Sequence, residues 1–355
     1  MIKGNKGEWS ELYVLLKLLA DGKIYAADDQ VQKLGHIYFP ILKILREEVR
    51  GRKIEYSINE QEIELYINNK KIKNISREML DKEAQFLYNQ IVSGINRTFG
   101  LAQTEEFIRN LECTKLSASS TNKTDILIQI HDIHTGYEPI CGFSIKSELG
   151  SEPTLLNASG ATNFVYEVLG ISDEQMIMIN SLDNPKSKIK DRMDKIFSIG
   201  NLRFVKTKNN NFATNLMLID SRMEEFMGEI LLCYYRDNES DCMKIIQKIE
   251  ERNPLNYPKK GFYEFKFKKF LCSVALGMMP SKNWNGRDEA NGGYIIVKSD
   301  GDVLAYHIYN RDYFENYLIN NTKLERGSTS KHGFASIYKE NEKMYINLNL
   351  QVRFK

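Results

Sequence analysis

The sequence predicts a mixed α+β fold, in which a central mixed sheet is flanked by helices and a further α+β lobe follows toward the C-terminal end. Residues 8–20 place apolar side chains three and four positions apart, as one face of a helix requires. Residues 53–67 alternate between apolar and polar side chains, which is typical of half-buried strands. Both patterns recur along the chain, and their mixture predicts a fold built from both kinds of element.

The N-terminal region is predicted element by element. The helix over 8–20 should end at Gly22, because glycine favours the turn that terminates a helix. Polar residues divide the alternating segment 53–67 into two runs, so a β-hairpin is expected there. A second helix is predicted over 76–95, with Ser76 as its N-cap.

The middle of the chain mixes strands and helices. Residues 125–130 and 140–146 are predicted strands joined by a turn, and they form a hairpin-like pair. The elements expected after this pair are a short helix at 160–169, a buried strand at 176–179, a basic amphipathic helix at 186–197 and a long helix at 215–234.

The last hundred residues are predicted to form a lobe of their own. Asn253-Pro254 interrupts the helical pattern, so we place the boundary between a region of residues 1–252 and a lobe of residues 253–355. Within the lobe, residues 293–309 should form a hairpin and residues 343–354 a closing strand.

Composition narrows the class of protein. The 355 residues carry 49 Lys and Arg against 47 Asp and Glu, a net charge of +2 that neither demands nor excludes a nucleic-acid partner. The five cysteines contain no CxxC motif, which favours a reducing compartment over a disulfide framework. No apolar run approaches the length of a membrane span, and no leader peptide is apparent, so we expect a cytoplasmic protein with no membrane association.

Three residues of the predicted strand pair suggest phosphodiester hydrolysis. Such hydrolysis at neutral pH needs a divalent cation, carboxylates to hold it and a lysine near the attacking water. Asp125 begins one strand, while Ser144 and Lys146 stand two apart on the next and so project from one face. This is the arrangement of a D…(D/E)xK nuclease core, except that Ser144 stands where an acid is usual. A cross-strand ion pair is the alternative for Asp125 and Lys146.

The first helix offers a second carboxylate. Glu11 closes a GxxGxxxE arrangement that begins at Gly4, and we predict that Glu11 and Asp125 are the ligands of a Mg²⁺ ion. Glu8 lies one turn earlier and is the competing candidate on this helix. For both glutamates the alternative is a solvated helix face or a partner of the helix dipole.

Three separated blocks of the sequence carry a family resemblance. GNKGEWSELYVLLKLLADGKIYAAD, GFSIKSELGSEPTLLNASGATNFVYEV and GGYIIVKSDGDVLAYHIYNRDYFENYLINNTKLERGSTSKHGFASIYKE, which is followed by LNLQVRF, resemble the HpaII family of type II restriction endonucleases. The resemblance implies a PD-(D/E)XK core and Mg²⁺-dependent cleavage of both strands of double-stranded DNA at a short sequence such as CCGG. It also implies a cognate DNA methyltransferase as genetic partner and leaves a homodimer possible. Ser144 departs from the usual pattern, because a hydroxyl can hold a metal-bound water but cannot balance the charge of the ion.

DNA recognition is expected on two polar segments. Their amides, hydroxyls and cationic groups suit base edges and phosphates alike. The first segment, after the catalytic strand, supplies Ser147, Ser151, Asn157, Ser159, Thr162 and Asn163. The second, in the C-terminal lobe, supplies Arg326, Ser328, Ser330 and Lys331. A loop with a helix cap is the alternative for the first segment, and a solvated surface turn is the alternative for the second.

Two functions compete at this stage. One is a Mg²⁺-dependent restriction endonuclease with Glu11, Asp125, Ser144 and Lys146 as the catalytic group. The other is a non-cleaving DNA-binding or repair accessory protein on the same fold, to which Ser144 gives some weight. The retained acid, lysine and helix glutamate favour the enzyme, because a protein without catalysis has no evident need for them.

Overall fold

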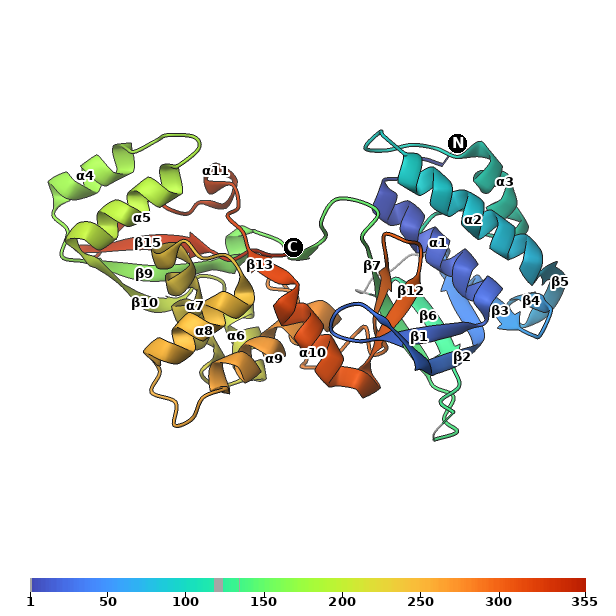
Figure 1. Cartoon of the computed structure of the whole chain (residues 1–355). Helices are drawn as coiled ribbons and strands as arrows, with labels where there is room; N and C mark the ends of the chain where they lie inside the picture. Colours follow the sequence, from blue (N-terminus) through green and yellow to red (C-terminus); the bar gives the residue numbers. More distant parts are fainter. Residues whose placement is uncertain (1, 118–123, 134) are drawn as a thin grey trace. The chain divides into compact units, whose positions relative to one another are not determined.

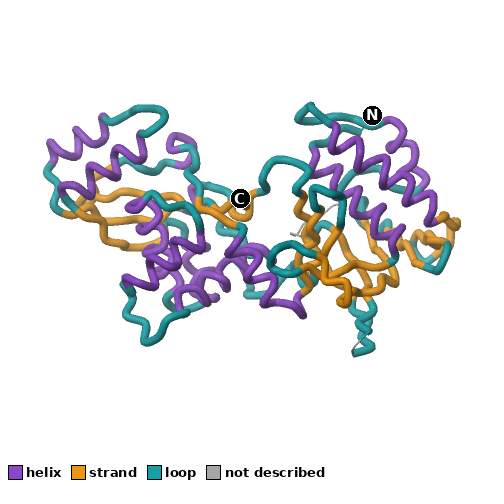
Figure 2. Tube along the Cα trace, viewed as in Figure 1, coloured by secondary structure: helices purple, strands orange, loops and turns teal. Residues whose placement is uncertain are grey.

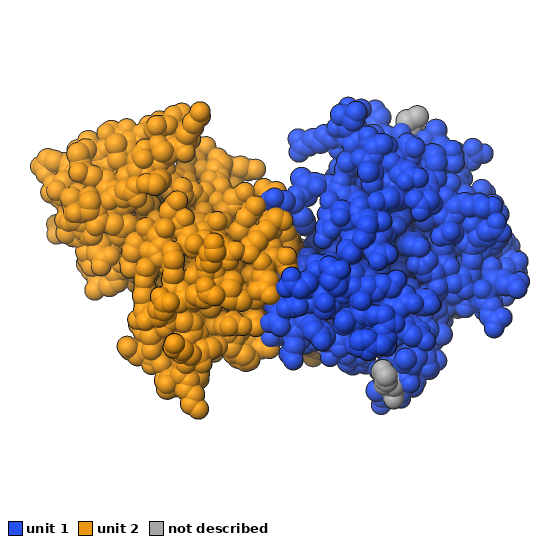
Figure 3. All heavy atoms as spheres, in the orientation of Figure 1, with its two compact units in different colours: residues 1–153, 288–317 blue, residues 154–287, 318–355 orange. Residues whose placement is uncertain are grey.

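The chain folds into two compact units. The computed structural model describes residues 2–117, 124–133 and 135–355. Residues 1–153 and 288–317 form unit 1, and residues 154–287 and 318–355 form unit 2 (Figure 3). The division differs from the boundary expected at 252/253. The cause is long-range strand pairing, because residues 293–307 complete the sheet of unit 1.

Unit 1 combines one large sheet with helices (Figure 1). Its helices are α1 (Lys6–Asp21), α2 (Arg77–Ser93), α3 (Ala102–Asn110) and α10 (Arg311–Asn320), the last of which crosses the 317/318 boundary. Its strands are β1 (Lys23–Ala27), β2 (Lys33–Glu47), β3 (Lys53–Ile58), β4 (Glu62–Ile67), β5 (Lys70–Ser76), β6 (Ile126–Ile130), β7 (Ile140–Ser147), β11 (Gly293–Val297) and β12 (Val303–His307).

The sheet of unit 1 is mixed. Its nine strands follow the order β1-β12-β11-β7-β6-β2-β3-β4-β5, and β1 also pairs with β2, so that six of the strands close into a ring of pairings. β7 pairs antiparallel with β6 and parallel with β11, and β1 pairs parallel with β12. Because β7 is paired on both edges, its register is fixed. The register determines which of its side chains leave each face of the sheet.

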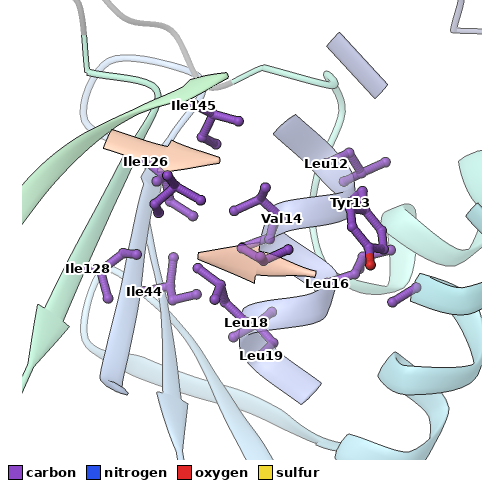
Figure 4. Close-up of a cluster of buried hydrophobic side chains, with 14 of the residues drawn as sticks. Leu12, Tyr13, Val14, Leu16, Leu18, Leu19, Ile44, Ile126, Ile128 and Ile145 are labelled. Atoms are coloured by element: carbon purple, nitrogen blue, oxygen red, sulfur yellow. The ribbon is translucent and has the colours of Figure 1, made fainter. Parts of the chain in front are cut away.

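Helix α1 supplies the core of unit 1. Its apolar residues, including Val14, Leu18 and Leu19, lie against Ile44 of β2 and Ile128 of β6 (Figure 4). Helix α2 packs beside α1. Most residues of α1 are buried, and nearly all of these are apolar. Glu11 is one of the polar residues of this helix.

Unit 2 has two smaller sheets covered by helices (Figures 1 and 2). Its strands are β8 (Thr154–Leu156), β9 (Asn163–Leu169), β10 (Asn201–Thr207), β13 (Thr322–Leu324), β14 (Ile337–Glu340), β15 (Lys343–Asn349) and β16 (Val352–Phe354). Its helices are α4 (Asp173–Ser181), α5 (Lys188–Ile199), α6 (Asn210–Ile219), α7 (Met223–Asp237), α8 (Cys242–Arg252), α9 (Phe262–Leu276) and α11 (Thr329–His332). The sheet orders are β10-β9-β15-β14 and β13-β16-β8.

Most elements with a strong local pattern are confirmed. The expected helices at 8–20, 76–95 and 186–197 correspond to α1, α2 and α5. The expected hairpins at 53–67 and 293–309 correspond to β3–β4 and β11–β12. In the part of the chain that the structure describes, no helix is long and apolar enough to cross a membrane.

Three expectations were wrong. Residues 160–169, expected as a helix, contain the central strand β9, whose aromatic and β-branched side chains are buried on both faces. Residues 176–179, expected as a buried strand, lie in α4, because a capping box formed by Ser172 and Gln175 starts a helix. The long helix at 215–234 is divided into α6 and α7 by a turn in which Asp220 Oδ1 accepts the amide of Arg222 at 2.9 Å.

Candidate active site

Strand pairing places Asp125 opposite Ser144. Asp125 directly precedes β6, and the register of β6 on β7 pairs Ile126 with Phe143. The amide of Asp125 donates to the carbonyl of Phe143 at 2.9 Å, which extends the pairing by one residue. Ser144 and Lys146 lie two apart on β7, so their side chains leave the same face of the sheet as Asp125. The shared face expected from the sequence is therefore present.

A chain of hydrogen bonds links these three side chains. Lys146 Nζ donates to Ser144 Oγ at 3.2 Å, and Ser144 Oγ donates to Asp125 Oδ2 at 3.1 Å. The backbone amide of Ile145 donates to the same carboxylate oxygen at 2.7 Å. Ser144 is 4% exposed, so its hydroxyl lies inside the site as a bridge between acid and lysine.

Lys146 is a half-buried cation. Burial lowers the pKa of its ammonium group, while the charges of Asp125 and Glu11 act in the opposite direction. Its Nζ also lies 5.3 Å from the ring centroid of Tyr294, which β11 places beside Ser144 by parallel pairing. Tyr294 was not expected at the site, because its place depends on a strand pairing between segments far apart in the sequence.

Glu11 reaches the site from α1. Burial raises the pKa of its carboxyl to about 7; a hydrogen bond with Ser117 lowers this pKa, and the charge of Asp125 raises it. Glu8 instead stabilises the start of α1, because its carboxylate accepts the amide of Asn5 at 2.8 Å in the capping box of this helix. The geometry therefore favours Glu11 over Glu8 as the helix carboxylate of the site.

Two carboxylates are the acidic groups available for a cation here. Among the described residues no cluster of three or more His, Cys, Asp or Glu side chains could hold a metal ion. Glu11 and Asp125 nevertheless interact electrostatically, and the raised pKa of Glu11 shows that burial makes its negative charge unfavourable. A divalent cation would relieve both effects, and Mg²⁺ commonly takes one or two protein carboxylates with water and phosphate. The residues present therefore fit Mg²⁺.

A pocket of about 650 Å³ opens beside these groups, and all of its lining residues belong to unit 1. Glu11 and Lys146 line it, as do Ser147 and Ser151 of the first predicted recognition segment. Ser147 Oγ accepts from Ser10 Oγ at 2.8 Å, which ties the end of β7 to α1. The pocket gives a phosphate group access to the Glu11 carboxylate and to Lys146.

The rest of the first recognition segment lies in unit 2. Ser159 caps the short 3₁₀ helix of residues 160–162 by accepting the amide of Ala161 at 3.2 Å. Thr162 and Asn163 are buried, and Asn163 Nδ2 donates to the carbonyl of His332 at 2.8 Å. Asn157 is exposed. Burial argues against direct DNA contact by Thr162 and Asn163, and Ser159 has the capping role that was the alternative for this part of the segment.

The second recognition segment lies beside the first, because the bond from Asn163 reaches His332, the residue that follows Lys331. Arg326 Nη2 donates to Asn238 Oδ1 at 2.6 Å, and the guanidinium carbon lies 5.8 Å from the ring centroid of Tyr234. Ser328 caps α11, and the exposed side chains of Ser330 and Lys331 follow. The structure thus places the unit 2 part of the first segment and the whole second segment in one region of that unit.

Comparison with known proteins identifies the family. The family model described as "HpaII restriction endonuclease" matches residues 5–354. The chain belongs to the HpaII restriction endonuclease family. One relative is the "Type II restriction enzyme HpaII" of Haemophilus parainfluenzae, which is 45% identical over 359 residues, covering 99% of this chain and 98% of the relative. No solved structure matches the chain. The near-complete coverage means that both units belong to the region shared with this HpaII relative.

Proposed function

We propose that this member of the HpaII family is a Mg²⁺-dependent type II restriction endonuclease that hydrolyses both strands of double-stranded DNA at a short sequence such as CCGG. The observation that carries the proposal is the hydrogen-bonded chain from Lys146 through Ser144 to Asp125, with Glu11 close enough to interact electrostatically. The name of the Haemophilus parainfluenzae relative supports the same activity.

A PD-(D/E)XK-like core is part of the proposal. An acid before β6, a lysine on the adjacent β7 and a glutamate on a helix that packs against the sheet are the parts that such a core uses. Ser144 replaces the strand acid, so the metal would be held by Glu11 and Asp125, with water and phosphate as its other ligands. The bound ion would lower the pKa of its water and offset the negative charge of the phosphate.

The side chains of the site have separate roles. Asp125, fixed by the Ser144 hydroxyl and the Ile145 amide, provides an oriented carboxylate. Lys146 orients or polarises the attacking water and stabilises negative charge on the phosphate. Ser144 holds the lysine and the acid at a defined separation. Glu11, with a pKa of about 7, is ionised above neutral pH and can then serve as a ligand.

The second candidate is a non-cleaving DNA-binding or repair accessory protein on the same fold. Ser144 is the observation in its favour, because a hydroxyl supplies no charge to balance a metal ion. The two candidates differ in one measurable property, the hydrolysis of DNA.

Incubation of the protein with unmethylated plasmid DNA tests the proposal. With Mg²⁺ we expect discrete fragments, and with EDTA uncut plasmid. Sequencing the fragment ends would give the recognition sequence and the cleavage position. Binding of the same DNA without any Mg²⁺-dependent cleavage would favour the accessory protein.

Two variants assign the metal ligands. Glu11→Ala and Asp125→Ala should abolish cleavage while DNA binding is retained or strengthened, because a negative charge next to phosphate is removed. Glu8→Ala is the matched control on the same helix and should keep the cleavage activity. If Glu8→Ala abolished cleavage and Glu11→Ala did not, the helix ligand would have been assigned to the wrong residue.

The remaining parts of the proposal concern partners. We propose a cytoplasmic protein that acts on double-stranded DNA, with a cognate DNA methyltransferase to protect the host sequence. A homodimer would cut both strands in one encounter, and a monomer would release nicked circles first. The order in which nicked and linear plasmid appear distinguishes these two modes.

A further inference from the structure

The pocket beside Glu11 and Lys146 also contains a segment that the sequence analysis did not select. Residues 94–97 follow α2, and all four line the pocket together with Lys6 at the start of α1. Arg97 and Ile95 are exposed, and Ile95 is 98% exposed. The segment therefore presents an arginine and an isoleucine to solvent next to the proposed catalytic group.

The base of this segment is attached to the helix that carries Glu11. Gly4 and Phe99 exchange backbone hydrogen bonds of 3.0 Å in both directions. Trp9 Nε1 donates to the carbonyl of Phe99 at 3.1 Å, and the two rings stack with centroids 5.9 Å apart. These contacts hold the end of residues 94–97 against the start of α1, the helix that carries Glu11.

The charges around the pocket are unbalanced. Lys6, Arg97 and Lys146 are its cationic lining residues, and Glu11 is its acidic one. Neither Lys6 nor Arg97 forms an ion pair with any residue in the described ranges; Lys6 Nζ donates only a long bond, 3.4 Å, to the carbonyl of Val92. Some other surface lysines of unit 1 are paired, as Lys82 is with Glu78 at 2.7 Å, and others, such as Lys70, form no ion pair within the described residues. Two unpaired cations beside a phosphodiesterase-like site favour a polyanionic partner.

We propose that Lys6 and Arg97 bind DNA phosphates adjacent to the scissile one, and that residues 94–97 form a DNA-contacting segment of unit 1. This inference rests on the proposed function and adds a contact surface to it. Each strand of B-DNA carries one phosphate per about 3.4 Å of helix axis, so a strand that places one phosphate at the carboxylates brings others close by. Ile95 would lie against the sugar edge of the same strand, where its apolar surface leaves water.

Binding titrations of a duplex carrying the mapped recognition sequence, performed in EDTA at several salt concentrations, test this proposal. Arg97→Ala and Lys6→Ala should each weaken binding roughly tenfold, as loss of a charged hydrogen bond does. The same factor should apply to an unrelated duplex, because phosphates carry no sequence information. The slope of log affinity against log salt should become shallower by about 0.9 for each lost contact.

Further variants separate charge from shape. Lys70→Ala, on strand β5 at the far edge of the sheet, removes one positive charge from unit 1 and should leave affinity and slope unchanged. Arg97→Lys keeps the charge and should retain most of the salt dependence of affinity that Arg97→Ala loses. Ile95→Ala should weaken binding without changing the slope, since it removes only apolar contact.

Each other result has a defined meaning. If Arg97→Ala and Lys6→Ala gave the same slope of log affinity against log salt as Lys70→Ala, the phosphate assignment would be overturned. Cleavage by the wild-type protein would still support the proposed function in that case. A loss confined to the recognition sequence would show that Arg97 reads a base and would overturn the assignment as well. A wild-type protein that neither binds nor cuts either duplex would overturn both proposals.

Discussion

Replacing Glu11 with Gln should stabilise the protein in a pH-dependent way. Burial raises the pKa of this carboxyl from 4.5 to about 7. Because the folded protein holds the proton more tightly than the unfolded chain does, ionisation of Glu11 opposes folding. The penalty is absent below the unfolded pKa of 4.5, grows as the pH rises toward about 7, and is complete above that value.

The size of this penalty follows from the shift in pKa. It amounts to about 1 kcal/mol near pH 5 and about 3 kcal/mol near pH 8.5. Glutamine has nearly the same shape and carries no charge, so Glu11→Gln should gain these amounts in the free energy of unfolding. The proposed ligand therefore lowers stability at the pH at which it would bind metal.

Urea unfolding in EDTA measures the difference. The chain has two tryptophans, Trp9 in unit 1 and Trp284 in unit 2, so a Trp284→Phe background lets fluorescence report on α1 alone. Glu8→Gln, one turn away, controls for the loss of a negative charge at this end of the helix. If the difference in free energy of unfolding between Glu11→Gln and its parent were the same near pH 5 and near pH 8.5, the reasoning would be refuted.

Four further outcomes are expected. Lys146→Ala should lower kcat by about two to three orders of magnitude with little change in DNA affinity, and near-normal turnover in single-turnover assays would contradict its role. Ser144→Ala should reduce cleavage less than Asp125→Ala does, because Asp125 keeps its bond from the Ile145 amide; an equal loss would make the hydroxyl indispensable. At limiting Mg²⁺ the cleavage rate should fall about tenfold per pH unit below about pH 7, since protons then compete for Glu11, and a flat profile would count against this ligand. Arg326→Ala should cost about 1–3 kcal/mol in binding and relax discrimination at one base pair, whereas an unchanged ratio between target and single-base variants would show that Arg326 does not read a base.

The sequence was sufficient for the parts of the site that depend on local spacing. Residues that stand two apart on one strand share a face whatever surrounds them, so the sequence alone places Ser144 and Lys146 together. The same holds for Glu11, because its position on the first helix follows from a strong apolar period. The position of Asp125 beside these residues could also be predicted, because β6 and β7 are neighbours both in sequence and in the sheet.

The parts that the sequence did not reveal depend on distant partners. Tyr294 reaches Lys146 only because β11 pairs with β7, and no local pattern encodes that pairing. The helix predicted over 76–95 includes residues 94 and 95, and only the bridge between Gly4 and Phe99 places residues 94–97 at the pocket. β9 was misassigned for a related reason, since an apolar run buried on both faces has no period by which to distinguish strand from helix.

The pairing of β7 has a consequence for the order of synthesis. One neighbour of β7, the strand β6, leaves the ribosome before it, while the other, β11, follows only with residues 293–297. Until then the strand that carries Lys146 has an open edge, and Tyr294 is absent from its side. A translation product that ends before β11 therefore lacks one neighbour of the strand that carries Lys146. The proposed catalytic group therefore acquires its complete sheet only after residues 154–287 of unit 2 have also been synthesised.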